Sequence, residues 1–90
     1  MNKIEIKYCK KCRWLLRSSW MAQEILSTFE EEVDELSLVP GTGGIFEITA
    51  NGQLIWSRKE MGGFPEIAEL KKLVRDIVAP DRNLGCIDRK

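Results

Sequence analysis

Apolar and polar residues alternate strictly over residues 3–8, with Ile4, Ile6 and Tyr8 on one side and charged residues on the other. This period of two is typical of a half-buried strand with one solvated face. From about Lys11 to Val33 the period becomes helical, and apolar residues recur three or four positions apart. The pattern predicts a strand and then a long amphipathic helix. Its last turn should be cut short, because the acidic residues there oppose the helix dipole.

The next segment predicts a short strand and a hairpin. Glu35–Val39 reads as a strand that ends at a glycine-rich connection over residues 40–44. Ile45–Ala50 and Gln53–Lys59 are β-rich runs. They are joined by Asn51-Gly52, the dipeptide favoured in two-residue type I′ turns.

The closing segment predicts a second helix and completes the fold class. Pro65 suits a first helical residue, and an apolar stripe continues to near Pro80. The order β-α-β-β-β-α predicts an α/β (α+β) protein with a right-handed crossover between parallel strands and an antiparallel hairpin. Because the first strand is polar on one face, we expect a mixed four-stranded sheet with both helices on the other face. A chain of 90 residues allows one domain over 1–90, with a core at 1–80 and an irregular tail at 81–90.

Composition excludes several functional classes. Hydrophobic residues make up 43% and charged residues 31% of the chain, as in globular proteins. The 14 basic and 14 acidic side chains cancel, so no net field attracts nucleic acid. No apolar run approaches the ~18 residues of a membrane span, and the first residues have no apolar stretch of signal-peptide length. We therefore expect a cytoplasmic protein with neither nucleic-acid nor membrane partners.

Cys9 and Cys12 form a Cys-x-x-Cys motif at the junction of the first strand and the first helix. With Cys12 one turn into the helix, the two sulfurs can meet. The helix N-terminus favours a thiolate, so the pKa of Cys9 should be lowered. In a compartment that keeps thiols reduced, such a pair is catalytic or metal-binding rather than structural. We expect Cys12 to be the more buried sulfur, Cys9 to attack a target disulfide, and Cys12 to resolve the mixed disulfide.

Basic side chains crowd around this motif. Lys10, Lys11 and Arg13 flank the cysteines, and Tyr8 precedes them. Nearby cations stabilise a thiolate, so tuning of the sulfur explains a basic cluster that is unfavourable in a first helical turn. Any one of these lysines taken alone is equally well explained as solvated surface.

Metal binding and protein interaction are the alternative functions. A Cys-x-x-Cys is half of a tetrahedral zinc site, but the chain has no histidine, and Cys86 is its only further thiol. Cu(I) is satisfied by two thiolates, as in copper carriers of ferredoxin-like topology. That topology needs a final strand, which Asp81–Lys90 does not favour. We expect no metal and no cofactor, and we interpret Cys86 as an ordinary tail cysteine. A redox-regulated interaction module without turnover remains a third reading.

Three motifs occur in one order along the chain: Tyr8-Cys9-x-x-Cys12, Gly44-x-Phe46-Glu47-Ile48 and a closing amphipathic helix. In this the chain resembles the selenoprotein W-like (SelT/SelW/SelH, Rdx) family. The resemblance implies a thioredoxin-like fold and a thiol–disulfide oxidoreductase with a protein or glutathione partner. It also implies that Cys12 matches the selenium position of selenocysteine-containing relatives. The loop Thr42-Gly43-Gly44 stands where thioredoxins carry a cis-proline, so it is the predicted substrate-docking loop.

Two tryptophans complete the set of candidates. Trp14 is interpreted as a core residue of the first helix. Trp56 is placed on the uncovered sheet face with Val39 and Ile45, where it would form an apolar patch for a partner or a second copy. A homodimer through the uncovered sheet face is thus one of two arrangements that the sequence leaves open, the other being a complex with a different protein.

Overall fold

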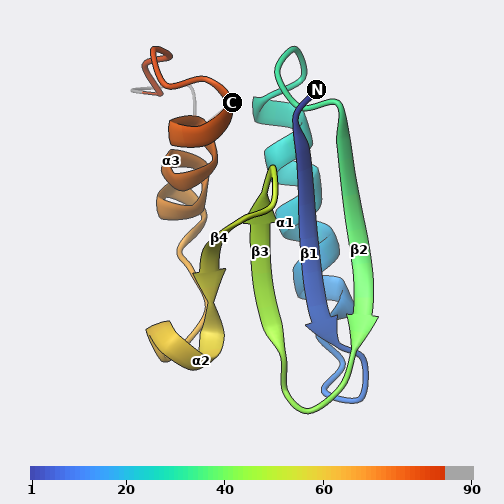
Figure 1. Ribbon diagram of the computed structural model, residues 1–90. Helices are drawn as coiled ribbons and strands as arrows, with labels where there is room; N and C mark the ends of the chain where they lie inside the picture. Colours follow the sequence, from blue (N-terminus) through green and yellow to red (C-terminus); the bar gives the residue numbers. More distant parts are fainter. Residues whose placement is uncertain (85–90) are drawn as a thin grey trace.

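The structure, a computed structural model, describes residues 1–84 (Figure 1). Its elements are, in order, β1 (Lys3–Cys9), α1 (Leu15–Thr28), β2 (Glu35–Gly41), β3 (Phe46–Ala50), β4 (Gln53–Ser57), α2 (Arg58–Met61) and α3 (Ile67–Val78). The predicted order is confirmed, and the short helix α2 is an addition to it. Residues 81–84 carry neither helix nor strand. Cys86 and the rest of the predicted tail lie outside the described residues.

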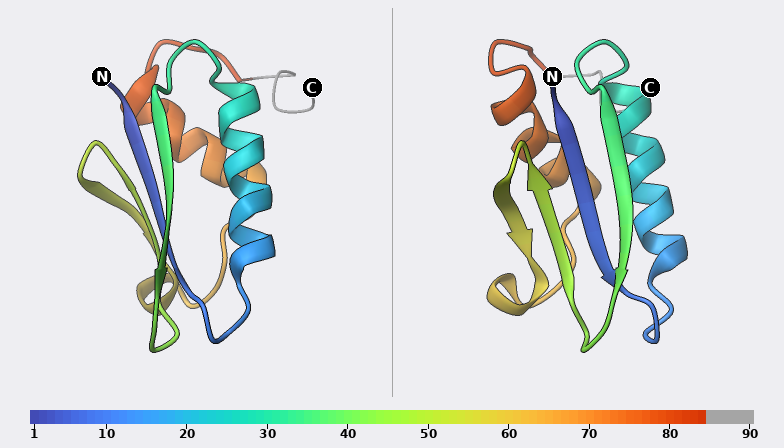
Figure 2. Two further views of the ribbon diagram at one scale, coloured as in Figure 1. Left: turned by 90° about the vertical axis from the view of Figure 1, so that its right-hand side faces the viewer. Right: turned by 45° about the vertical axis from the view of Figure 1, so that its right-hand side comes forward.

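The four strands form one mixed sheet in the order β2-β1-β3-β4. β1 and β2 run parallel, and α1 is the crossover between them. β3 pairs antiparallel with both β1 and β4. Figure 2 shows α1 and α3 on the same face of the sheet. The predicted sheet, with both main helices on one face, is therefore confirmed.

Asn51 and Gly52 join β3 and β4 in the predicted turn. Their φ angles are 53° and 82°, and a type I′ turn requires positive φ at both positions. The Asn51 side-chain oxygen accepts a hydrogen bond from the Lys3 backbone N–H at 2.8 Å. The tip of the hairpin is thereby tied to the start of β1.

The core lies between the covered face of the sheet and the two main helices, and Trp56 belongs to it. The prediction of an apolar patch around Trp56 on the uncovered face is wrong. Trp56 is only 6% exposed, lies opposite Ile48, and donates its indole N–H to the Gly63 carbonyl at 3.0 Å. The register shifts between Ile48 and Thr49, so that Leu54 lies opposite Thr49. Such a bulge breaks the alternation of faces and turns Trp56 inward.

Helix α1 is shorter than its apolar pattern predicts at both ends. It begins at Leu15 rather than Lys11 and ends at Thr28. The early end fits the acidic residues 30–32, which oppose the helix dipole. Phe29 is fully buried, so the apolar stripe continues past the last helical turn. Periodicity alone therefore overestimates the helix.

Helix α3 packs against α1 through an apolar stripe and one buried lysine. It begins at Ile67, just after Pro65, and ends before Pro80, close to the predicted bounds. Lys71 is 1% exposed, and its Nζ lies 3.0 Å from the Glu24 carboxylate on α1. The two helices that cover the sheet are thus joined by an ion pair as well as by apolar contact.

Candidate functional site

Cys9 is the last residue of β1, and a tight turn over residues 10–13 carries the chain toward α1. The Lys10 N–H donates to the Gly41 carbonyl at the end of β2 (3.0 Å), and the Arg13 N–H donates to the Lys10 carbonyl (3.2 Å). Arg13 has a φ of 62°, which a right-handed helix cannot contain. The prediction that Cys12 lies one turn into the helix is therefore wrong: Cys12 lies in the turn before it.

The two sulfurs differ in exposure, in the sense opposite to the prediction. Cys9 is 2% exposed, whereas Cys12 is exposed on the turn. Cys9 ends an inner strand of the sheet, and its sulfur accepts a hydrogen bond from the Gly44 backbone N–H. Both cysteines are free thiols. A molecule arriving from solvent therefore meets Cys12 first.

The hydrogen bond between the two sulfurs shifts their pKa values in opposite directions. The pKa of Cys9 is lowered chiefly because the Cys12 thiol donates to its sulfur; burial opposes this, and the backbone N–H groups of Gly44, Cys12 and Lys11 assist it. The same hydrogen bond is the main cause that raises the pKa of Cys12, and burial and the charge on Cys9 raise it further. The Gly44 N–H and the Arg58 guanidinium lower it by smaller amounts. The predicted direction for Cys9 is confirmed, with loop N–H groups in place of a helix end. These opposite shifts favour a thiolate on Cys9 over a thiolate on Cys12.

The connection between β2 and β3 reaches the sulfurs through its glycines. Gly43 and Gly44 have φ angles of 74° and 75°, in the left-handed region. A Cβ at either position would meet no atom within 4 Å, so a side chain would not clash there. Glycine is favoured at these positions because of the positive φ. No peptide bond in the described part of the chain is cis. The structure thus brings Gly44 of the predicted docking loop to the cysteine pair, while Thr42 stays exposed.

An aromatic cluster supports the other side of the site. Trp14 meets Phe64 and Phe46 edge to face, with ring centroids 5.0 Å and 6.5 Å apart, and Phe46 meets Phe64 at 4.9 Å. The Arg58 guanidinium lies 4.9 Å from the Trp14 ring and 5.5 Å from the Phe64 ring, and Arg17 lies 4.2 Å from Phe64. Trp14 packs against the core, as predicted, but it lies just before α1 rather than within it. The cluster holds Arg58 where its charge lowers the pKa of Cys12.

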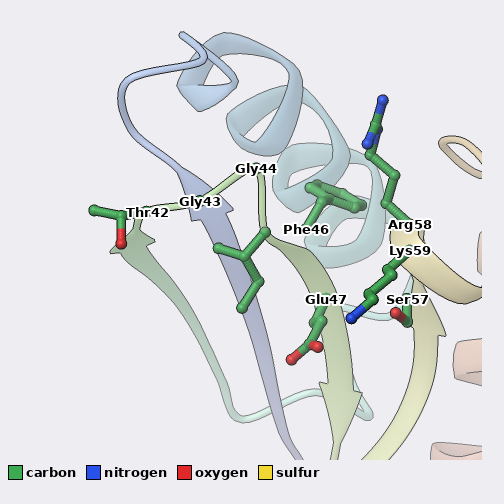
Figure 3. Close-up of a pocket in the computed structure, with 9 residues that line it drawn as sticks. Thr42, Gly43, Gly44, Phe46, Glu47, Ser57, Arg58 and Lys59 are labelled. Atoms are coloured by element: carbon green, nitrogen blue, oxygen red, sulfur yellow. The ribbon is translucent and has the colours of Figure 1, made fainter.

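Arg58 and Lys59 belong to α2, although the β-rich run Gln53–Lys59 predicts a single strand that gives them no place in the site. A signal was present: the Ser57 hydroxyl accepts a hydrogen bond from the Glu60 N–H (3.4 Å), as in a capping box, and α2 begins at the next residue. A pocket of about 450 Å³ lies between α2 and the β2–β3 loop (Figure 3). It is lined by Thr42, Gly43, Gly44, Ile45, Phe46, Glu47, Ser57, Arg58 and Lys59.

The remaining predicted site residues lie around the motif. Lys10, Lys11 and Arg13 are exposed on the turn, and Tyr8 is buried opposite Phe46 on the covered face. Over residues 1–84, no three His, Cys, Asp or Glu side chains come together as metal ligands would. Within the same range, no helix is long and apolar enough to cross a membrane.

Solved structures with similar folds include a selenoprotein W-related protein from Vibrio cholerae. It is 55% identical, with a TM-score of 0.83, and the match covers 84% of this chain and 95% of that one. A protein from Bordetella parapertussis is 56% identical, with a TM-score of 0.82 and coverages of 83% and 95%. The predicted thioredoxin-like fold is therefore confirmed.

Two curated relatives and a family model identify the family of the chain. Migration and invasion enhancer 1 from Mus musculus is 35% identical over 74 residues, and its Bos taurus counterpart is 32% identical over 75. The matches cover 80% and 81% of this chain but only 61% and 62% of those proteins. The model of the Rdx family matches residues 3–76. The selenoprotein W-like resemblance is thus confirmed, and the chain belongs to the redox-associated Rdx family.

Proposed function

We propose that this protein is a cytoplasmic thiol–disulfide oxidoreductase that works through Cys9 and Cys12. The observation that carries the proposal is the hydrogen-bonded pair of free thiols, in which Cys9 has a lowered pKa and Cys12 is open to solvent. Thiolates are the nucleophiles of disulfide exchange. A pair that stores a thiolate beside an exposed sulfur has both groups that the reaction needs.

The exposure of the sulfurs assigns their roles in this proposal. The shared proton moves from Cys12 to Cys9, and the Cys12 thiolate attacks one sulfur of a substrate disulfide. A bond forms between Cys12 and that sulfur, the substrate S–S bond breaks, and the leaving thiolate takes the proton from Cys9. The Cys9 thiolate then attacks the Cys12 sulfur and expels the second half as a thiolate, which solvent protonates. The protein loses two electrons as a Cys9–Cys12 disulfide, and the substrate gains them as two thiols.

The partner in this scheme is a protein disulfide or glutathione disulfide. The family resemblance supports either one, and the exposed Cys12 can meet either. No cofactor is required, because the sulfur pair carries both electrons. A reducing thiol from the same compartment then returns the pair to its dithiol form.

Single cysteine variants test the proposal, each made together with Cys86→Ser so that only the motif thiols react. After incubation with glutathione disulfide, intact mass should show a stable mixed disulfide on Cys9→Ser, in which Cys12 attacks and no resolving sulfur remains. Cys12→Ser should react slowly, because its remaining sulfur is buried. A variant with neither motif cysteine is the blank. A mixed disulfide that accumulates only on Cys12→Ser would reverse the two roles, and absence of exchange in all proteins that retain a motif thiol would refute the function.

A further inference from the structure

The pocket between α2 and the β2–β3 loop is next to the cysteine pair, with which it shares Gly44. Gly44 lines it and also donates its backbone N–H to the Cys9 sulfur, so one residue separates the pocket from the reacting pair. Its volume of about 450 Å³ is within the range of small-molecule sites. The pocket can therefore hold the part of a small disulfide that extends away from the sulfur.

Two opposite charges face this space without neutralising each other. Figure 3 shows the Lys59 ammonium and the Glu47 carboxylate on the same side of β3 and β4. Within residues 1–84 no ion pair joins them, although four other ion pairs form there. A ligand that carries one ammonium and one carboxylate can satisfy both side chains at once, whereas a ligand with a single charge meets one attractive and one repulsive group.

The other cations nearby have different neighbours. The Arg58 guanidinium is stacked on the Trp14 and Phe64 rings, and in Figure 3 it extends away from Glu47. Lys7 is the cross-strand neighbour of Glu47 on β1 but does not line the pocket. Lys59 is thus the cation that shares the pocket space with Glu47.

We propose that this pocket binds the α-amino-acid end of a small disulfide, with Lys59 holding the carboxylate and Glu47 the ammonium group. This inference rests on the proposed function and names its substrate class: disulfides that carry a free α-amino acid close to sulfur. A peptide disulfide whose cysteine lies inside a chain, glutathione disulfide included, has neither free group at that place, so it can react at Cys12 without filling this pocket. The pocket therefore favours a small-molecule partner over an extended peptide.

A binding experiment that needs no redox chemistry tests the pocket. The probe is S-methylcysteine, which carries the zwitterion on an unreactive thioether, and amide proton–nitrogen NMR spectra of the reduced protein follow its titration. Saturable shifts are expected at Gly43, Gly44 and Glu47. Lys59→Gln and Glu47→Gln should each weaken binding by about fivefold, the upper range for an exposed ion pair. Lys72→Gln, which removes an exposed lysine on α3 outside the pocket, is the matched control and should bind normally.

Single-charge analogues complete the design. Methylthiopropionate keeps only the carboxylate and methylthioethylamine only the amine, so both should bind more weakly than S-methylcysteine to the unmodified protein. Glu47→Gln should improve methylthiopropionate binding, because it removes the repulsive carboxylate, and Lys59→Gln should improve amine binding for the same reason. Equal binding of all three compounds, no saturable shift, or unchanged binding in both pocket variants would overturn the proposal.

A kinetic comparison separates this proposal from the proposed function. The rates of Cys12 exchange with cystine and with hydroxyethyl disulfide are measured, and their ratio is compared between the unmodified protein and Lys59→Gln. Taking the ratio cancels any general change in sulfur reactivity, and it should fall about fivefold in the variant. A ratio that does not change overturns the pocket assignment. If neither disulfide reacts while S-methylcysteine still binds as described, the exchange function fails and the amino-acid site stands.

Discussion

Replacement of Phe64 tests whether the aromatic cluster holds the site in place. Phe64→Leu removes two edge-to-face contacts, at 5.0 Å and 4.9 Å, and keeps much of the apolar area. Each such contact contributes about 0.5–1.5 kcal/mol beyond burial. Because Phe64 is half-buried and neighbouring contributions do not simply add, we expect the free energy of unfolding to fall by about 2 kcal/mol. Phe64→Ala should lower it by about 3–4 kcal/mol in total, since it also removes apolar contact.

Urea unfolding followed by far-ultraviolet circular dichroism measures both losses, and thermal unfolding should agree with it at about 4–8 °C for each kcal/mol. Leu54→Ala, an exposed residue far from the cluster, is the control and should change little. The site provides a second readout. Without the Phe64 ring, Arg58 loses part of its support, the pKa of Cys12 rises further, and alkylation of Cys12 at a fixed pH slows. A Leu variant as stable as the unmodified protein, beside a strongly weakened Ala variant, would refute the role given to edge-to-face contacts.

Two further predictions concern groups that are partnered inside the fold. Glu24→Gln removes the α1 carboxylate that pairs with the buried Lys71 and should lower the free energy of unfolding by about 1–3 kcal/mol, whereas adding Lys71→Met should recover most of that loss; urea unfolding of the unmodified protein and the two variants measures this, and a double variant no more stable than Glu24→Gln would contradict it. Cys12→Ala removes the thiol that lowers the pKa of Cys9, whereas Cys12→Ser keeps a hydroxyl donor at that place. The thiolate absorbance of Cys9 should therefore titrate at higher pH in the alanine variant than in the serine variant. Coincident titrations of the two variants would contradict this cause.

Features that depend on neighbours in the sequence were predictable. Alternation over residues 3–8 identified β1, because a strand with one covered face needs an apolar residue at every second position. Asn51-Gly52 identified the hairpin, because few other pairs accept positive φ at both positions. The cysteine motif was predictable as a feature of the end of the first strand, and β1 does end at Cys9.

Features that arise from packing were not predictable in the same way. Arg13 takes a left-handed conformation that its residue type does not favour, and this delays α1 and leaves Cys12 exposed. The bulge at Ile48 and Thr49 turns Trp56 inward, and no local sequence motif predicts this bulge. Gly44 reaches Cys9 only because β2 and β3 flank β1, so its role depends on the sheet order.

The contact between Gly44 and Cys9 has a consequence for protein synthesis. A growing chain exposes both cysteines long before the β2–β3 loop has been made. Until β1 has paired with β2 and β3, the turn lacks its anchor at Gly41 and Cys9 lacks the Gly44 donor. In an unfinished or unfolded copy the pKa of Cys9 is therefore higher, and that of Cys12 lower, than in the folded protein. The difference in acidity between the two sulfurs is acquired only on folding, when the β2–β3 loop closes over the end of β1.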